Sequence, residues 1–142
     1  GLMHDIGKLC VPDEIVEKPA RLTVAEFSVM ERHSFETFQI LRHVPGLETV
    51  AEWAAFHHEA LNGHGYPFRR SAPTLVPEAR IIAVADVFQA LAQVRPYRGA
   101  QRLDEISCTL GEFAGKGILD PDIVALAREA LDSSFRAATQ TI

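Results

Sequence analysis

The sequence predicts an all-α fold in which a single helical domain occupies residues 1–142. Apolar residues recur at helical spacing in several long segments, and no segment shows the strict alternation of a half-buried strand. Capping signals precede several of these segments. The chain has 142 residues, of which 47% are hydrophobic and 23% charged, so it is long enough to bury one core.

Capping residues and prolines mark where the expected helices begin. Thr23 and Glu26 form a capping box. Pro77 suits the first position of a helix, and Asp120 followed by Pro121 gives an N-cap and a first helical residue. The predicted helices are the end of a helix at 1–10, then 23–43, 47–60, 77–93, 104–113 and a last helix at about 121–137.

Two segments between these helices are expected to lack regular structure. Residues 11–22 contain Pro12 and Pro19, which interrupt helices, and therefore predict a turn-rich connection. Residues 61–76 are rich in Gly, Pro and Ser and predict a long loop.

Charge and apolar patterning exclude several classes of protein. A net charge of −5 argues against binding to polymeric nucleic acid. The apolar runs are too short to span a bilayer, and the chain does not begin with a signal peptide. Residues 69–102 contain six arginines against two acids, which fits either a site for a small anionic ligand or a solvated face. Cys10 and Cys108 form no motif and are expected to be buried free thiols.

The stretch "HDIGK" places two groups with metal-binding chemistry side by side. His4 and Asp5 are adjacent, and Lys8 lies on their side if the stretch is helical. A carboxylate in apolar surroundings must be paired or bound to a metal. The alternative to a metal site is a salt bridge between Lys8 and Asp5, with His4 hydrogen-bonded in the core.

Further candidate ligands lie in the predicted helices. Asp86 lies in a helix that is apolar nearly all round, so it needs either an internal partner, such as Arg80 or Arg95, or a metal. His57 and His58 are consecutive, and neighbours on a helix do not face the same way. Two successive imidazoles make sense if the end of the helix meets a wide metal cluster.

His33 lies mid-helix among apolar residues and can face the same centre. For a single histidine of this kind, a hydrogen-bonded core imidazole is the usual alternative. Imidazoles and carboxylates without thiolates suit Fe, Mn, Zn, Co or Ni, and six ligands fit two bridged ions better than one. The candidate set is His4, Asp5, His33, His57, His58 and Asp86.

These motifs together resemble a known family. "HDIGK", His33, "HHE", "NGHGYP" and "VADVFQALAQVRPYR" are similar to the motifs of HD-GYP domains, the subgroup of HD phosphohydrolases that hydrolyses cyclic di-GMP. The resemblance runs from residue 2 to about 126. It implies an all-helical HD-domain bundle and a cytoplasmic bacterial signalling module, attached to an upstream receiver or sensor domain.

The resemblance also implies how the candidate ligands are shared. His33, His57 and His58 are expected to bind one metal, together with a bridging Asp5. His4, Asp5 and Asp86 are then expected to bind the second metal. The resemblance implies two or three divalent ions, with Fe or Mn favoured and Zn, Co or Ni as alternatives.

Further residues match the family's substrate-binding and catalytic positions. Lys8 is expected to contact the scissile phosphate or to protonate the leaving oxygen, alongside Asp5 at the metals. Tyr66 and Pro67 are expected to line the substrate groove after a tight turn at Gly63 and Gly65.

Two arginines of "RPYR", Arg95 and Arg98, match the residues that grip the second phosphate, with surface packing as the alternative. Arg69 and Arg70 have no such match and are expected to be solvated loop charges.

The chain departs from the family pattern at a few positions. Asn62 stands where Asp is common, Gln89 where an Asp usually follows the metal aspartate, and Ser34 where proline follows the third histidine. Thr37 replaces a smaller residue. The family also supplies a histidine, and in some members a glutamate, from a helix before "HD", so the N-terminal part of the domain is expected to be missing.

The predicted function is a metal-dependent phosphodiesterase that hydrolyses cyclic di-GMP to pGpG, GMP or both. One alternative is a catalytically inactive HD-GYP receptor that acts by binding partners. Another is an HD phosphohydrolase for a different nucleotide. The GYP loop is a candidate contact for GGDEF-type domains.

Overall fold

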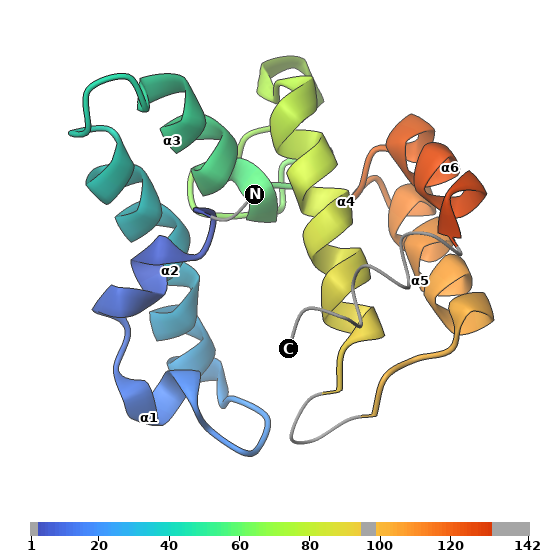
Figure 1. The fold of residues 1–142 in the computed structure, drawn as a ribbon, viewed down its shortest axis with the longest axis horizontal. Coiled ribbons are helices and arrows are strands. Elements are labelled where there is room, and N and C mark those ends of the chain that lie inside the picture. The colour runs from blue at the N-terminus through green and yellow to red at the C-terminus, as the bar shows by residue number, and fades with distance from the viewer. Residues whose placement is uncertain (1–2, 95–98, 132–142) are drawn as a thin grey trace.

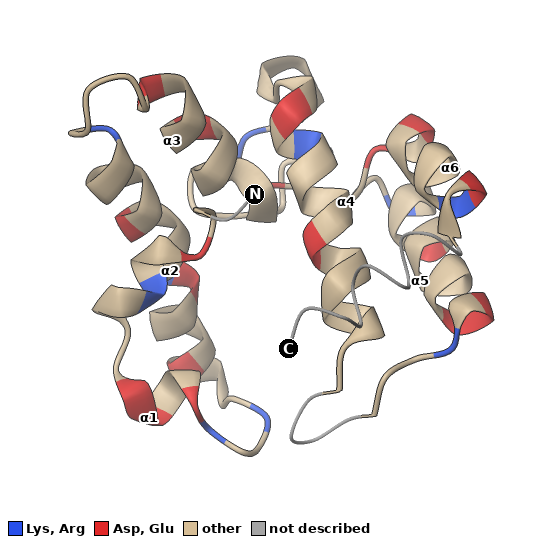
Figure 2. Cartoon of the chain, in the orientation of Figure 1, with Lys and Arg blue, Asp and Glu red and all other residues tan. Residues whose placement is uncertain are grey.

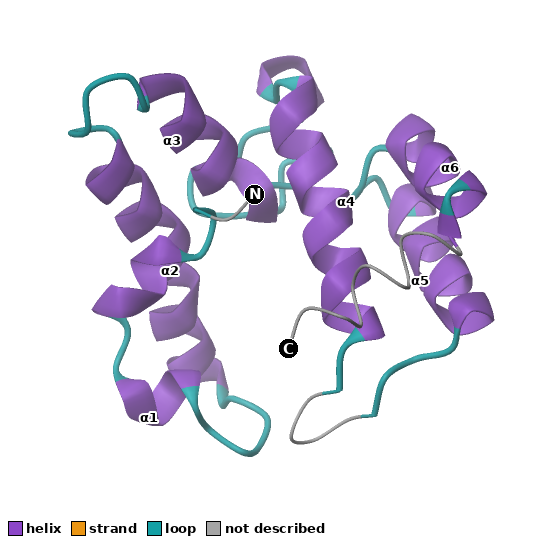
Figure 3. Cartoon of the chain, in the orientation of Figure 1, coloured by secondary structure: helices purple, strands orange, loops and turns teal. Residues whose placement is uncertain are grey.

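A computed structural model describes residues 3–94 and 99–131, and this part of the chain is helical without a named strand (Figures 1 and 3). The predicted all-α fold is therefore confirmed. In chain order the elements are η1 (Ile6–Cys10), α1 (Asp13–Val16), α2 (Val24–Leu41), α3 (Glu48–Ala55), η2 (Phe56–His58), η3 (Ala72–Thr74), α4 (Pro77–Ala92), α5 (Leu103–Gly115) and α6 (Pro121–Glu129), where η denotes a 3-10 helix.

Helix α2 begins at the predicted capping box. The Thr23 hydroxyl accepts from the Glu26 amide at 3.3 Å, and the Glu26 carboxylate accepts from the Thr23 amide at 2.7 Å. Lys18 Nζ also donates to this carboxylate, at 2.6 and 2.8 Å, so the loop before α2 is tied to its first turn. The helix ends at Leu41, close to the predicted end.

The "HDIGK" segment is not the end of an α-helix, as the sequence predicts, but a turn followed by the 3-10 helix η1. Gly7 packs directly on α2, because an added Cβ would clash with the His33 carbonyl and lie 2.5 Å from the Thr37 amide. The short helix α1 lies within the segment predicted to be rich in turns.

The helix predicted at 47–60 is shorter than expected. Helix α3 ends at Ala55, and the chain tightens into η2, which holds His57 and His58. The centroids of the His57 and His58 rings lie 3.9 Å apart at this end of the helix, so both imidazoles reach one side.

Helices α4 and α6 begin where their prolines predict. Pro77 occupies the first turn of α4, and the Asp120 carboxylate caps α6 by accepting from the amides of Asp122 and Ile123. Arg80 donates to Asp120 at 3.0 Å and so joins α4 to the start of α6. Helix α6 ends at Glu129, short of the predicted end at about residue 137, and the predicted residues 132–137 lie outside the described part of the chain.

Helix α4 runs through the middle of the molecule in Figure 1, with α1, α2 and α3 on one side and α5 and α6 on the other. The largest buried cluster joins α4 to α5 and α6, and two smaller clusters lie between α2, α3 and the start of α4. Fully buried core side chains include Leu41, Ile106 and Leu110.

The 61–76 segment is a loop, as predicted, apart from the short 3-10 helix η3, and hydrogen bonds hold its two ends together. An isolated bridge pairs Asn62 with Ser71, and the Ala72 amide donates to the Leu61 carbonyl at 3.0 Å. The Asn62 amide donates to the Gly117 carbonyl at 2.8 Å, so the loop also contacts the segment after α5.

Two expectations about the surface can be compared with the structure. Cys10 and Cys108 are free, as expected, but both are exposed, so the prediction that they are buried is wrong. Cys10 is the last residue of η1, and the Cys108 thiol lies 3.8 Å from Glu112 on the outer side of α5. Acidic and basic residues are spread over the helices in Figure 2. Among the described residues, no helix is long and apolar enough to cross a membrane.

Candidate metal centre

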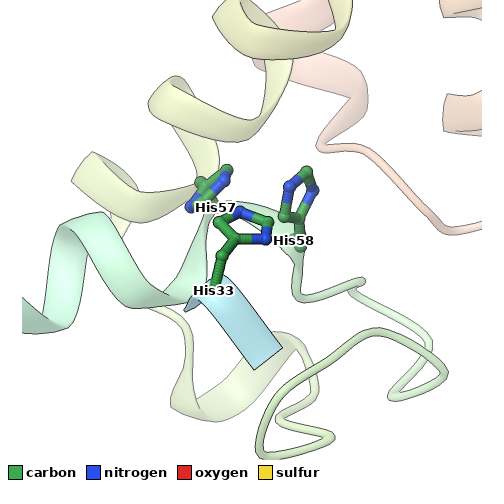
Figure 4. A group of neighbouring side chains, drawn as sticks. All are labelled: His33, His57 and His58. Carbon is green, nitrogen blue, oxygen red and sulfur yellow. The ribbon is translucent and has the colours of Figure 1, made fainter. Parts of the chain in front are cut away.

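Four segments bring the predicted ligands together. The turn before η1 supplies His4 and Asp5, α2 supplies His33, η2 supplies His57 and His58, and α4 supplies Asp86. Figure 4 shows His33 rising from α2 close to the rings of His57 and His58.

Three imidazoles form the first group of candidate ligands. One nitrogen each from His33, His57 and His58 lies within 4.8 Å of the others. Two ligands on one ion stand at most about 4.2 Å apart, since a metal–nitrogen bond is ~2.1 Å. The three rings therefore need only a small adjustment to bind one ion.

Hydrogen bonds fix which nitrogen of the His33 and His57 rings faces the cluster. His33 Nδ1 donates to the Met30 carbonyl at 2.6 Å, and His57 Nδ1 donates to the Ala54 carbonyl at 2.5 Å. The Nε2 atoms then carry the lone pairs that a metal requires. His57 Nε2 is buried without a hydrogen-bond partner among the described residues. A buried nitrogen without a partner is costly in a purely structural cluster, and it fits a metal ligand.

Two carboxylates surround His4 and form the second group. His4 Nε2 lies 3.4 Å from Asp5 Oδ2 and 3.5 Å from Asp86 Oδ1. Asp5 Oδ1 also lies 3.5 Å from His33 Nε2, so its two oxygens face the two groups. Asp5 therefore lies between the two groups of candidate ligands. His4, Asp5 and His57 also form a compact candidate group, with their ligand atoms within 4.8 Å.

Burial keeps the imidazoles neutral at neutral pH. It lowers the pKa of His33, lowers that of His57 to about 4, and lowers that of His58 to about 2 with a further contribution from the His57 charge. For Asp86, burial favours the protonated form, but the hydrogen bond from His4 and the nearby His58 outweigh it and lower the pKa to about 2. Neutral imidazoles beside ionised carboxylates are the protonation states that metals bind.

The structure can be compared with the salt bridges that were the alternatives to metal binding by Asp5 and Asp86. Lys8 Nζ does form a salt bridge with Asp5, at 2.6 Å. This contact leaves Asp5 Oδ1 facing His33. Arg80 does not pair with Asp86 but with Asp120. Arg95, the other proposed partner, lies outside the described residues.

The loop after the histidines places an aromatic ring beside the cluster. The Tyr66 ring lies 4.8 Å from the His58 ring at an interplanar angle of 31°, and the Tyr66 amide donates to the His58 carbonyl at 3.1 Å. Burial raises the pKa of Tyr66, so its hydroxyl remains a donor. Pro67 follows through a cis peptide bond.

The two glycines of the loop serve different purposes. Gly63 has a φ of 78°, in the left-handed region, as its predicted role in a turn requires. Gly65 instead allows close contact, because an added Cβ would lie 2.5 Å from both the His58 carbonyl and the Glu59 Cα.

Glu59 is a residue of the site to which the sequence assigns no role. Its side chain is buried, and its carboxylate accepts from the Phe68 amide at 2.6 Å and the Arg70 amide at 2.9 Å. The carboxylate therefore holds the far side of the loop that carries Tyr66. The signal in the sequence is an acidic residue directly after two buried histidines.

Two departures from the family pattern have structural explanations. The buried Thr37 hydroxyl accepts from the Gly7 amide at 2.9 Å and donates to the His4 carbonyl at 3.0 Å, joining "HDIGK" to α2. Asn62 accepts from the His64 amide and also donates to the Lys116 carbonyl, each at 3.0 Å. An aspartate could make only the first of these bonds.

A cavity of about 490 Å³ opens beside the cluster. Its lining includes Asp5, Lys8, His33, His58, Tyr66 and Asp86, and it extends over α1 and the loop that follows. Pro67 is not among the lining residues. The predicted phosphate-gripping residues Arg95 and Arg98 lie outside the described part of the chain.

The described arginines of 69–102 do not gather at this cavity. Arg80 and Arg102 form ion pairs with Asp120 and Asp104. Arg69 and Arg70 are exposed, as expected for loop charges, and Arg70 lies 4.6 Å from the centre of the Phe56 ring.

Comparisons with known proteins identify relatives that share most of this chain. A 3'3'-cGAMP-specific phosphodiesterase 1 of Vibrio cholerae is 45% identical over 87% of the chain, and a 3'3'-cGAMP-specific phosphodiesterase 3 of that organism is 39% identical over 92%. A cyclic di-GMP phosphodiesterase of Thermotoga maritima is 38% identical over 86%. The chain spans 28%, 28% and 33% of the lengths of these three proteins.

A model of the HD domain family matches residues 1–123, which include the candidate ligands and the GYP loop. This match extends over most of the chain, and it agrees with the helical fold described above. The chain belongs to the HD domain family, in the HD-GYP subgroup that its motifs predict.

Proposed function

We propose that this domain is a metal-dependent phosphodiesterase that hydrolyses cyclic di-GMP to pGpG, GMP or both. The observation that carries the proposal is the meeting of three neutral imidazoles and two carboxylates at the head of a cavity, with His57 Nε2 lacking a hydrogen-bond partner among the described residues. The names of the relatives support the same reaction class.

The ligand atoms suit two divalent ions, with Fe or Mn as the proposed metals and a third ion as an extension. His33, His57 and His58 would hold one ion, His4 and Asp86 would hold the other, and Asp5 would bridge them. When bound there, the metals would activate a water molecule as nucleophile and neutralise charge on the phosphate. The neutral state of the imidazoles keeps their lone pairs available at physiological pH.

Other side chains would bind the substrate. Lys8 lines the cavity and contacts Asp5, so its ammonium group can shift to the scissile phosphate or give a proton to the leaving oxygen. Tyr66 would stack on a base or donate from its hydroxyl group, with Pro67 holding the loop. Arg95 and Arg98 are proposed to bind the second phosphate.

A second candidate substrate is 3'3'-cGAMP, because the two Vibrio cholerae relatives described above act on it according to their names. It shares the ring and both phosphates with cyclic di-GMP and differs in one purine. The metal ions would contact the phosphates, which are the same in both substrates. Selectivity between the two substrates would therefore depend on the residues around the bases.

Turnover of cyclic di-GMP and 3'3'-cGAMP, with products separated by chromatography, tests the proposal. We expect the chain to release pGpG or GMP when loaded with Mn²⁺ or Fe²⁺. The Lys8→Ala variant should retain metal but lose turnover by roughly 10²–10⁴-fold, the usual contribution of a general acid. Binding without turnover under every metal tested would instead favour an inactive receptor.

The whole protein's partners belong to this proposal as well. The loop at residues 61–70 is a candidate contact for GGDEF-type domains, and an upstream receiver or sensor domain would regulate the activity. A cytoplasmic location is proposed with these partners, because cyclic dinucleotide signals act inside bacteria.

A further inference from the structure

The cavity continues well beyond the metal centre. Its far part is formed by α1, the loop at 17–22 and the first turns of α2. Apolar side chains make up much of this part, and two of them, Val16 and Phe27, are 41% and 47% exposed. The Phe27 ring meets the Tyr66 ring edge to face at 6.4 Å. These surfaces suit a flat aromatic ligand.

The cations that line the cavity differ in whether they are already paired. Lys8 forms its salt bridge with Asp5, and Lys18 donates twice to Glu26. Arg21 also lines the cavity, from the loop between α1 and α2. Nothing in residues 3–94 or 99–131 forms an ion pair or hydrogen bond with its guanidinium group. Figure 2 shows basic positions on this loop, at the bottom of the view.

We propose that this part of the cavity is a purine subsite in which Arg21 reads guanine. The inference rests on the proposed function, because only a nucleotide substrate brings a purine into the cavity. Arg21 would be a specificity-determining residue for the base and would take no part in bond cleavage.

The chemistry of the two purines explains the choice. Guanine presents two acceptors, O6 and N7, on one edge, and the fork of a guanidinium group donates to both. Adenine presents an acceptor at N7 and a donor at N6. The guanidinium group therefore loses one hydrogen bond, and one of its N–H donors faces the N6 amino donor. A lysine in this position could donate but could not match both atoms.

Binding of GMP and AMP to the Mn²⁺-loaded chain, measured by calorimetry, tests Arg21 directly. The wild-type protein should bind GMP at least roughly tenfold more tightly than AMP, the discrimination typical of one bidentate contact. Arg21→Ala and Arg21→Lys should bring the two affinities close together. Arg21→Gln should shift preference toward AMP, because the glutamine amide matches adenine N6 and N7.

Arg32→Ala serves as the matched control. Arg32 lies on α2 with a side chain 72% exposed, forms a 3.7 Å ion pair with Glu36, and is not among the described residues that line the cavity. This variant should keep the wild-type ratio of GMP to AMP affinity. A wild-type protein that binds the two nucleotides equally, or an Arg21→Ala variant that keeps the wild-type ratio, would overturn the assignment.

Turnover of cyclic di-GMP by the wild-type chain, measured in parallel, separates the two proposals. Turnover together with a GMP preference that is independent of Arg21 contradicts only the purine subsite. A GMP preference that depends on Arg21, without turnover of any cyclic dinucleotide, contradicts only the proposed function.

Discussion

The positions of three candidate ligands, His4, His33 and His57, depend on uncharged neighbours. Backbone carbonyls of Met30 and Ala54 accept from His33 and His57, and this fixes the nitrogens that face the cluster. Thr37 holds the backbone of His4 through a single hydroxyl group. Such contacts position the ligands before any metal binds, and preorganisation of this kind strengthens metal affinity.

Glu59 provides a test of this positioning at the level of one residue. Glu59→Gln replaces one accepting oxygen with an NH₂ group that faces a backbone N–H, because both carboxylate oxygens accept from the loop. We expect the free energy of unfolding to fall by about 1–3 kcal/mol, the usual cost of an unsatisfied buried group. We also expect slower turnover, because the loop carries Tyr66.

Urea unfolding and steady-state kinetics measure these two effects. Glu52→Gln is the matched control, since it makes the same change at an exposed position on α3. A Glu59→Gln variant with wild-type stability and KM would show that the carboxylate does not hold the loop.

At the level of elements, the sequence predicts helices best where a local signal marks their start. The capping box at Thr23, Pro77 in α4 and the Asp120 cap all appear where expected. These signals involve residues at most three positions apart, so they can be recognised without knowing the tertiary structure.

Elements shaped by tertiary packing are the ones that the sequence predicts poorly. Gly7 allows the "HDIGK" segment to pack against α2, and α3 gives way to η2, which holds His57 and His58. The six candidate ligands could be found from residue types and family motifs. The roles of Glu59 and Thr37 could not, because their bonds join residues 9 to 33 positions apart.

The contact between η1 and α2 leads to a prediction about Gly7. Gly7→Ala adds a methyl group against the His33 carbonyl and the Thr37 amide, both of which are backbone groups that cannot move aside easily. We expect a loss of about 2–4 kcal/mol in unfolding free energy. Metal content should fall as well, because His4 and Asp5 move away from His33.

Gly115→Ala is the comparison for thermal unfolding and metal analysis. An added Cβ at Gly115, the last residue of α5, meets nothing within 4 Å. Alanine there should leave stability unchanged or raise it slightly. Equal behaviour of the two variants would mean that η1 is not packed on α2 as described.

For the whole molecule, the buried histidines predict how stability depends on pH. Burial lowers the pKa of His57 to about 4 and that of His58 to about 2, from the ordinary histidine value of 6.5. At pH values between these lowered pKa values and 6.5, the unfolded chain binds more protons than the folded chain. The metal-free protein should therefore lose stability, by a few kcal/mol, as pH falls from about 6.5 toward 4.

Urea unfolding in the presence of a chelator, at several pH values, measures this dependence. His64→Asn should leave the slope unchanged, because His64 is exposed. His57→Asn should make the slope shallower. Stability that stays level or rises as pH falls through this range would contradict the description of the histidines as buried and neutral.

Metal content per chain is the measurement that tests the central claim most directly. We would determine it by elemental analysis of the wild-type protein, of His58→Ala and of the exposed-histidine control His64→Ala. The account predicts about two divalent ions per chain in the wild type and in His64→Ala, as in other two-metal phosphodiesterases, and a clear loss in His58→Ala. A wild-type protein that binds no metal after loading, or a His58→Ala variant with full metal content, would contradict it.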